Sequence, residues 1–202
     1  MSTAKRLAPE LENGAVMTRE EFHEAYAECE GLRRAELVEG VVYMPSPVRY
    51  ESHDKPAALL RGWLFSYSLK HPETETGGEA SLLLGQSEVQ PDAFLLRVGS
   101  VPIDDDGYLT GAPQLIVEVA ASSKSRDLHS KMEVYRRHGV VEYIVWRTVD
   151  QEIDWFRSVD GQFRRVQPDG DGVIESSDFP GLRLSIPAAL AMDAARVVAL
   201  LD

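Results

Sequence analysis

The run Leu-Ile-Val-Glu-Val-Ala at residues 115–120 constrains the fold of this chain more than any other segment. A short run that is aliphatic apart from one residue, and rich in β-branched side chains, predicts a strand buried on both faces. The exception is Glu118, and an ionised carboxylate is costly to bury unless it is paired or bound to a metal. The fold must therefore supply Glu118 with a cation, either an arginine or lysine side chain or a metal ion.

A second acid, Asp92, opens another apolar run, which predicts a strand over residues 92–98. Neighbouring strands lie ~4.8 Å apart, so two strand ends can present Asp92 and Glu118 to one divalent ion. Mg²⁺, or Mn²⁺ in its place, prefers oxygen ligands and retains water, so two carboxylates would suffice to hold it. Without a cation, two carboxylates this close repel each other.

Lys131 lies on a predicted helix at residues 126–138, which ends at Gly139. One interpretation is an exposed pair with Asp127, four residues earlier, worth about 0.3–0.5 kcal/mol. The other places the Lys131 ammonium over the end of the Glu118 strand, where it would stabilise charge on a reacting phosphate. Both interpretations stay open on the residues alone. Two carboxylates, a shared cation and a lysine together indicate a metal-dependent phosphodiesterase.

Two further polar residues are candidates for the same site. Glu36 lies on the first of two predicted strands that flank the tight turn Glu39-Gly40, and its side chain can face the same cleft. His53 precedes a long helix predicted to end near residue 69, and it can hydrogen-bond a phosphate or a carboxylate. A histidine near a helix start is nevertheless more often a polar surface or capping group.

The remaining pattern predicts a mixture of helices and strands. A capping box at Thr18 begins a first helix, and the unit at 115–146 is strand, helix, strand with parallel strands. The class is α/β or α+β with a central mixed sheet, a loose leader at 1–16 and a single domain at 17–202. The other predicted elements are a polar loop at 73–78, a strand at 81–89, an acidic surface loop at 100–112, a strand at 142–146, a hairpin at 153–166, and a last strand and short helix after 182.

The composition limits the partners and the cellular location that can be expected for this chain. The formal net charge of -12 opposes a general nucleic-acid-binding surface. The single cysteine, Cys29, excludes an internal disulfide framework and suits a reducing cytoplasm. No apolar run approaches the ~20 residues of a membrane span, so a cytoplasmic location away from membranes is expected.

Several segments, in this order and spacing from about residue 18 to 190, resemble the Uma-two family of bacterial proteins, which are described as "putative restriction endonucleases". They are Arg34-Ala-Glu36-Leu-Val-Glu-Gly40, Met44-Pro-Ser-Pro47, His53, Pro91-Asp92, Pro113-Gln-Leu-Ile-Val-Glu118-Val, Asp127 with Lys131, Tyr135, and Gly139-Val-Val-Glu142-Tyr. The resemblance implies the restriction-endonuclease-like PD-(D/E)XK fold, a central mixed sheet flanked by helices with metal bound at strand ends.

The resemblance also implies roles for individual residues. Asp92 and Glu118 carry over as metal ligands, with the Val119 carbonyl as a third. The lysine of the pattern should stand two residues after the glutamate, but Ala120 occupies that position. Lys131 on the following helix is then its replacement, and Lys124 on the preceding loop is the alternative lysine at the substrate. Glu36 matches an acid that some relatives of the fold supply from an early helix, and His53 is left as a substrate-binding candidate.

Two functions follow. The first is a Mg²⁺- or Mn²⁺-dependent DNA endonuclease. The acidic net charge of the chain argues against this function, because DNA binding rests on Lys and Arg contacts with phosphates. The second is a weakly catalytic or non-catalytic homo-oligomeric module that keeps the fold for protein contacts. The aromatic residues at 142–146 and at 155–156 would supply an interface, although core packing explains them equally well.

Overall fold

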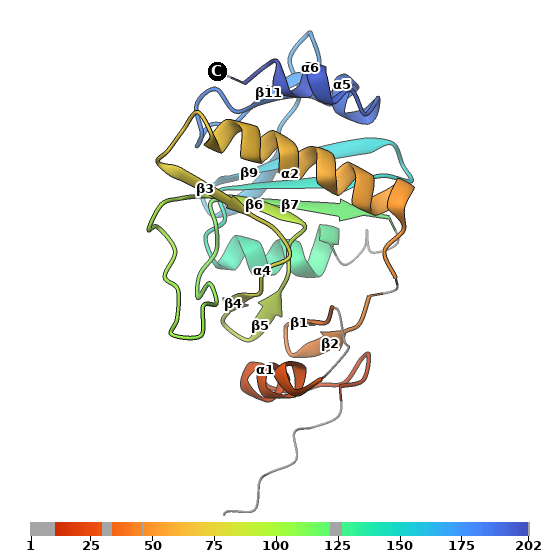
Figure 1. Ribbon diagram of the computed structural model, residues 1–202. Helices are drawn as coiled ribbons and strands as arrows, with labels where there is room; N and C mark the ends of the chain where they lie inside the picture. The colour runs from red at the N-terminus through yellow and green to blue at the C-terminus, as the bar shows by residue number, and fades with distance from the viewer. Residues whose placement is uncertain (1–10, 30–33, 46, 122–126, 202) are drawn as a thin grey trace, which may run out of the picture.

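A six-stranded sheet forms the centre of the protein, and helices cover both of its faces (Figure 1). The computed structural model describes residues 11–29, 34–45, 47–121 and 127–201. The strand order is β10-β9-β8-β7-β6-β3, and only β7 and β8 pair in parallel, so the predicted mixed sheet is confirmed. Its strands are β3 (Thr74–Gly77), β6 (Ala93–Arg97), β7 (Leu115–Ala120), β8 (Glu142–Arg147), β9 (Glu152–Val159) and β10 (Gln162–Arg165).

Strand β7 lies inside this sheet, and all of its residues are buried. The parallel crossover from β7 to β8 passes through a π-helical turn, η2 (Asp127–Lys131), and the helix α4 (Met132–Arg137). The strand–helix–strand unit predicted from the sequence is therefore confirmed. Among the described helices, none combines the length and the apolar character that crossing a bilayer requires.

Alternation along β7 divides the core into two parts. Leu115, Val117 and Val119 pack on the side of α2 (Lys55–Ser68), together with the C-terminal elements. Ile116 and Ala120 pack on the opposite side, against α4. Glu118 lies between these two in the alternation, so its side chain faces α4. The C-terminal elements are β11 (Val173–Glu175), β12 (Arg183–Ser185), α5 (Ile186–Leu190) and α6 (Ala194–Val198).

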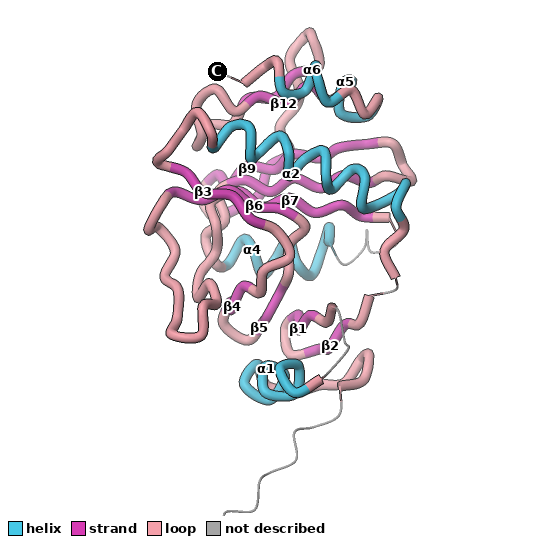
Figure 2. The backbone as a smooth tube through the Cα atoms, in the orientation of Figure 1, coloured by secondary structure: helices cyan, strands magenta, loops and turns pink. Residues whose placement is uncertain are grey.

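A smaller sheet lies beyond α4, as the tube in Figure 2 shows. Its strand order is β2-β1-β5-β4, and the helix α1 (Arg19–Glu28) packs on its outer face. On β1, Leu37 faces α1, whereas Val38 packs with the α4 core, so Glu36 also points inward toward the main sheet. The strands are β1 (Glu36–Val38), β2 (Val41–Tyr43), β4 (Leu82–Leu84) and β5 (Ser87–Val89).

The predicted N-terminal leader is only partly described. Residues 1–10 lie outside the described residues. Residues 11–16 run beside β2, where Gly14 N donates to the Val42 carbonyl at 2.8 Å and Val42 N donates to the Ala15 carbonyl at 2.8 Å. Leu11 packs in the core under α1. Thr18 and Glu21 form the predicted capping box at the start of α1.

Three predicted elements differ from the structure. The polar loop at 73–78 contains β3, an edge strand that pairs with β6. The single strand at 81–89 is a hairpin of β4 and β5, because Gly85, with φ of 58°, turns the chain between them. The long helix predicted from about residue 52 begins as a π-helical turn, η1 (Tyr50–Asp54), and continues as α2, with Pro56 in its first turn.

Candidate active site

Asp92 and Glu118 lie on the same face of the main sheet, at adjoining strand ends. In the antiparallel pair of β6 and β7, Ala93 stands opposite Val117, so Asp92 stands opposite Glu118. Residues opposite each other in a ladder point to one face. The backbone N–H of Val119 donates to Asp92 Oδ2 at 2.7 Å, which fixes the aspartate against the end of β7.

Lys131 reaches into this site from η2. Its Nζ lies 2.8 Å from Glu36 Oε1 and also contacts Glu118 Oε1. The side chains of all three residues are between 1% and 3% exposed. Lys131 is therefore a buried cation shared by two carboxylates, which rules out the exposed ion pair. The side chain of Asp127, the partner in that interpretation, lies outside the described residues.

Arg34, like Tyr135, lies in a motif of the family resemblance, but sequence reasoning assigned neither of them a role in the site. Its Nη1 donates to Asp92 Oδ1 at 3.0 Å, and its Nη2 donates to the Gln90 carbonyl and lies 3.8 Å from Glu36 Oε1. Burial alone would lower the pKa of this guanidinium, but the charges of Glu36 and Asp92 raise the pKa above its ordinary value. Arg34 therefore lies between Asp92 and Glu36 as a second cation of the site.

Each of the three carboxylates thus has a cation of the protein beside it, and Glu36 and Glu118 share Lys131. Burial alone would raise the pKa of Asp92, but the hydrogen bond from His53 and the charge of Arg34 lower it below its ordinary value. Burial would likewise raise the pKa of Glu36, and the charges of Lys131 and Arg34 outweigh it and lower that pKa. Both acids are ionised at neutral pH because a cation lies beside each one.

The lowered pKa of Asp92 predicts a loss of stability in acid. Its unfolded pKa is about 3.9, and its folded pKa is lower, so the stabilisation is complete above about pH 4. The stabilisation is lost as the pH falls from there toward the folded pKa. We expect the difference in unfolding free energy between wild type and Asp92→Asn to shrink below pH 4, measured by urea unfolding at each pH. A difference that stays constant from pH 3 to 7 would contradict this assignment.

Tyr135 and His53 complete the surroundings of the two strand-end acids. Tyr135 Oη donates to Glu118 Oε1 at 2.7 Å, and burial together with the charge of Glu118 raises the pKa of this phenol well above its usual value. Tyr135 is therefore a neutral donor. His53 Nε2 lies 3.4 Å from Asp92 Oδ2, so this histidine contacts a carboxylate, while its buried Nδ1 has no hydrogen-bond partner among the described residues.

The oxygen atoms at the strand ends match the preferences of a hard divalent ion. The N–H and C=O of one strand residue point to the same neighbouring strand, so the Val119 carbonyl is directed to the side on which its N–H meets Asp92. Two carboxylates and a carbonyl are ligands that Mg²⁺ accepts. Within the described ranges no group of three or more His, Cys, Asp or Glu side chains is arranged to hold a metal. A metal site here would need the carbonyl and water in addition to Asp92 and Glu118.

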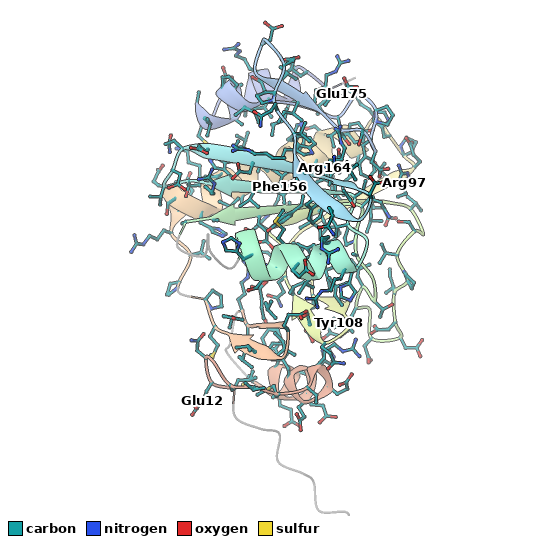
Figure 3. The ribbon with its side chains drawn as sticks, turned by 180° about the vertical axis from the view of Figure 1, so that it is seen from behind. Glu12, Arg97, Tyr108, Phe156, Arg164 and Glu175 are labelled. Carbon is teal, nitrogen blue, oxygen red and sulfur yellow. The ribbon has the colours of Figure 1, made fainter. Side chains whose placement is uncertain are left out.

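The sequence also pointed to two other positions for the lysine of the site, residues 120 and 124. Ala120, where the family pattern places its lysine, is buried beside the α4 core on the same face as Glu118. Lys124 lies outside the described residues. Seen from behind in Figure 3, α4 lies between the two sheets, so a side chain from its start enters the space over that face. Lys131 fills that space from the helix side.

The chain is similar to known proteins in both its sequence and its fold. The model of a family described as "Uma2: Putative restriction endonuclease" matches residues 19–188. A solved structure from Anabaena variabilis ATCC 29413, described as a "putative nuclease belonging to DUF820", is similar with a TM-score of 0.68 and 17% sequence identity. The match covers 87% of this chain and 98% of that one, and it confirms the predicted fold. No curated protein matches the chain.

Proposed function

The chain belongs to the Uma2 family, described as "Putative restriction endonuclease", and we propose on this premise that it is a divalent-metal-dependent DNA endonuclease. The observation that carries the proposal is the meeting of Asp92, Glu118 and Lys131 on one face of the sheet. These residues come from two adjoining strands and a following helix, and burying them together is costly for a fold that has no use for them.

Each residue has a distinct part in this proposal. Asp92, Glu118 and the Val119 carbonyl would hold Mg²⁺ or Mn²⁺, which supplies Lewis-acid activation and charge neutralisation when bound. Lys131 places a positive charge beside the reacting phosphate and stabilises the negative charge that develops there. Tyr135 orients the Glu118 carboxylate through its hydrogen bond. His53 orients Asp92 at 3.4 Å, and its buried Nδ1 is a candidate contact for the DNA phosphate.

A specific observation favours a second function. The acids and Lys131 are at most 3% exposed, and each acid already has a cation of the protein beside it. A closed site whose acids are already paired with cations of the protein, in a chain with a net charge of -12, fits a homo-oligomeric interaction module that retains the fold. The cytoplasmic location expected from the single cysteine stays a prediction. The two functions differ in whether the site acts on DNA.

Cleavage of supercoiled plasmid in the presence of Mg²⁺ or Mn²⁺ separates the two functions. We expect the wild type to nick the plasmid and Asp92→Asn to be inactive, because the variant removes a metal-binding carboxylate while keeping its shape. Asp105→Asn, at an exposed acid, is the matched control because it changes the net charge equally. Nicking by Asp92→Asn at the wild-type rate would show a contaminating nuclease and remove the support for the endonuclease.

A further inference from the structure

Lys131 Nζ is shared by two carboxylates that belong to different sheets. Glu118 lies on β7 of the main sheet, and Glu36 lies on β1 of the small sheet, with its Oε1 at 2.8 Å from the ammonium. Only Glu118 belongs to the proposed metal-binding set. A cation that contacts both acids keeps one ion-pair partner when a metal ion binds the other.

We propose that Glu36 is a positioning residue that retains Lys131 when a divalent ion binds Glu118, so that the lysine exchanges a position shared by the two acids for one on Glu36. This inference rests on the proposed metal site. The exchange is required because a divalent ion and an ammonium on the same carboxylate repel each other in a low-dielectric interior. Retention by Glu36 keeps the lysine charge inside the site, beside the phosphate, instead of releasing it to solvent.

Glu36 is suited to this part because its position does not depend on Glu118. The backbone N–H of Gln90 donates to Glu36 Oε1 at 2.8 Å, and Arg34 Nη2 lies 3.8 Å from the same oxygen. The Gln90 bond does not involve Glu118, so it remains if Lys131 leaves Glu118. The ammonium also lies 5.9 Å from the centre of the Tyr135 ring, within the range of a cation–π contact, on the α4 side. Glu36 and Tyr135 together can therefore hold Lys131 without Glu118.

A double-mutant cycle on metal affinity tests this role and separates it from direct ligation by Glu36. Mn²⁺ binding is measured by calorimetry for wild type, Glu36→Gln, Lys131→Met and the double variant. We expect Glu36→Gln to weaken Mn²⁺ binding about tenfold, because Lys131 then loses the Glu36 carboxylate and competes with the ion for Glu118. We expect Lys131→Met to bind Mn²⁺ as tightly as wild type or more tightly. In that background Glu36→Gln should change the affinity by less than about twofold, because the competitor is gone.

The other outcomes overturn the inference. An equal loss of affinity in both backgrounds would make Glu36 a metal ligand, and no loss in either would leave it without a part in metal binding. A wild type that binds no Mn²⁺ would refute the exchange together with the metal site. If the coupling is found but plasmid stays intact, the inference stands and the endonuclease function fails.

A second measurement is made on the wild type, and it needs a folded variant only to assign the resonance. The Lys131 side-chain ammonium is followed by ¹⁵N NMR, assigned by its disappearance in Lys131→Met, while Mg²⁺ is added. We expect the resonance to shift and to stay protected from exchange with water, because the ammonium leaves Glu118 and stays with Glu36. Loss of the resonance through fast exchange would mean release to solvent, and an unchanged resonance would mean that no exchange of partners occurs.

Discussion

Lys131→Met is expected to lower the rate of plasmid cleavage by about 10²-fold or more, the loss seen when one electrostatic stabiliser is removed from an active site. The lysine lies against Glu118 and is 1% exposed, so no water replaces its charge beside the reacting phosphate. Methionine keeps an unbranched apolar side chain in place of the lysine stem and removes the ammonium. The rate is measured at saturating Mg²⁺, well below the melting temperature of the variant.

Two control variants isolate the charge of Lys131. Lys55→Met makes the same change at a 40% exposed lysine on α2, and it should cleave at close to the wild-type rate. Lys131→Arg keeps a positive charge and should recover part of the loss. Wild-type cleavage by a folded Lys131→Met protein would reduce this lysine to a structural counter-ion of Glu36 and Glu118.

Arg34→Met is expected to lower the free energy of unfolding by about 3–5 kcal/mol, the cost of breaking a buried ion pair by removing one partner. Arg34 contacts Asp92 at 3.0 Å, and Asp92 is 1% exposed, so the variant leaves a buried carboxylate with much less compensation. The Gln90 carbonyl loses a donor in the same change. Urea unfolding at pH 7, without divalent metal, measures the effect.

The matched control for this prediction is Arg19→Met, which removes an arginine that pairs with an exposed acid, Glu20. Its effect on the unfolding free energy should be much smaller, because solvent already screens that pair. Equal losses in the two variants would contradict the view that Arg34 neutralises a buried site. A loss for Arg34→Met that persists in the Asp92→Asn background would place its main partner elsewhere.

The part of the fold that sequence predicted depends on local patterns. The run at 115–120 has the composition of a doubly buried strand, and β7 is such a strand. Asp92 and Glu118 interrupt or border apolar runs, so a need for cations was visible in the sequence. The strand β3 was missed because its first three residues, Thr74, Glu75 and Thr76, are all polar and show no apolar face. Its pairing with β6 arises only in the folded sheet.

The part of the site that sequence left open depends on long-range contacts. Arg34 lies 58 positions from Asp92, and no local spacing connects them. Sequence predicts that Asp92 and Glu118 repel, and that Glu118→Gln would therefore relieve strain. The structure gives each acid its own partners, so the neutral variant leaves Lys131 with one carboxylate fewer. We therefore expect Glu118→Gln to be less stable than wild type in the absence of metal.

The central claim, that the Asp92–Glu118 pair holds a divalent ion, is tested most directly by calorimetric titration of Mn²⁺ into wild type and Glu118→Gln. Glu75→Gln, at an exposed acid on β3 of the same sheet, is the control for the change in net charge. The structure predicts one saturable site in wild type and in Glu75→Gln, no binding in Glu118→Gln, and a rise in melting temperature only where Mn²⁺ binds. Equal binding by Glu118→Gln, or no binding by wild type, would contradict the claim.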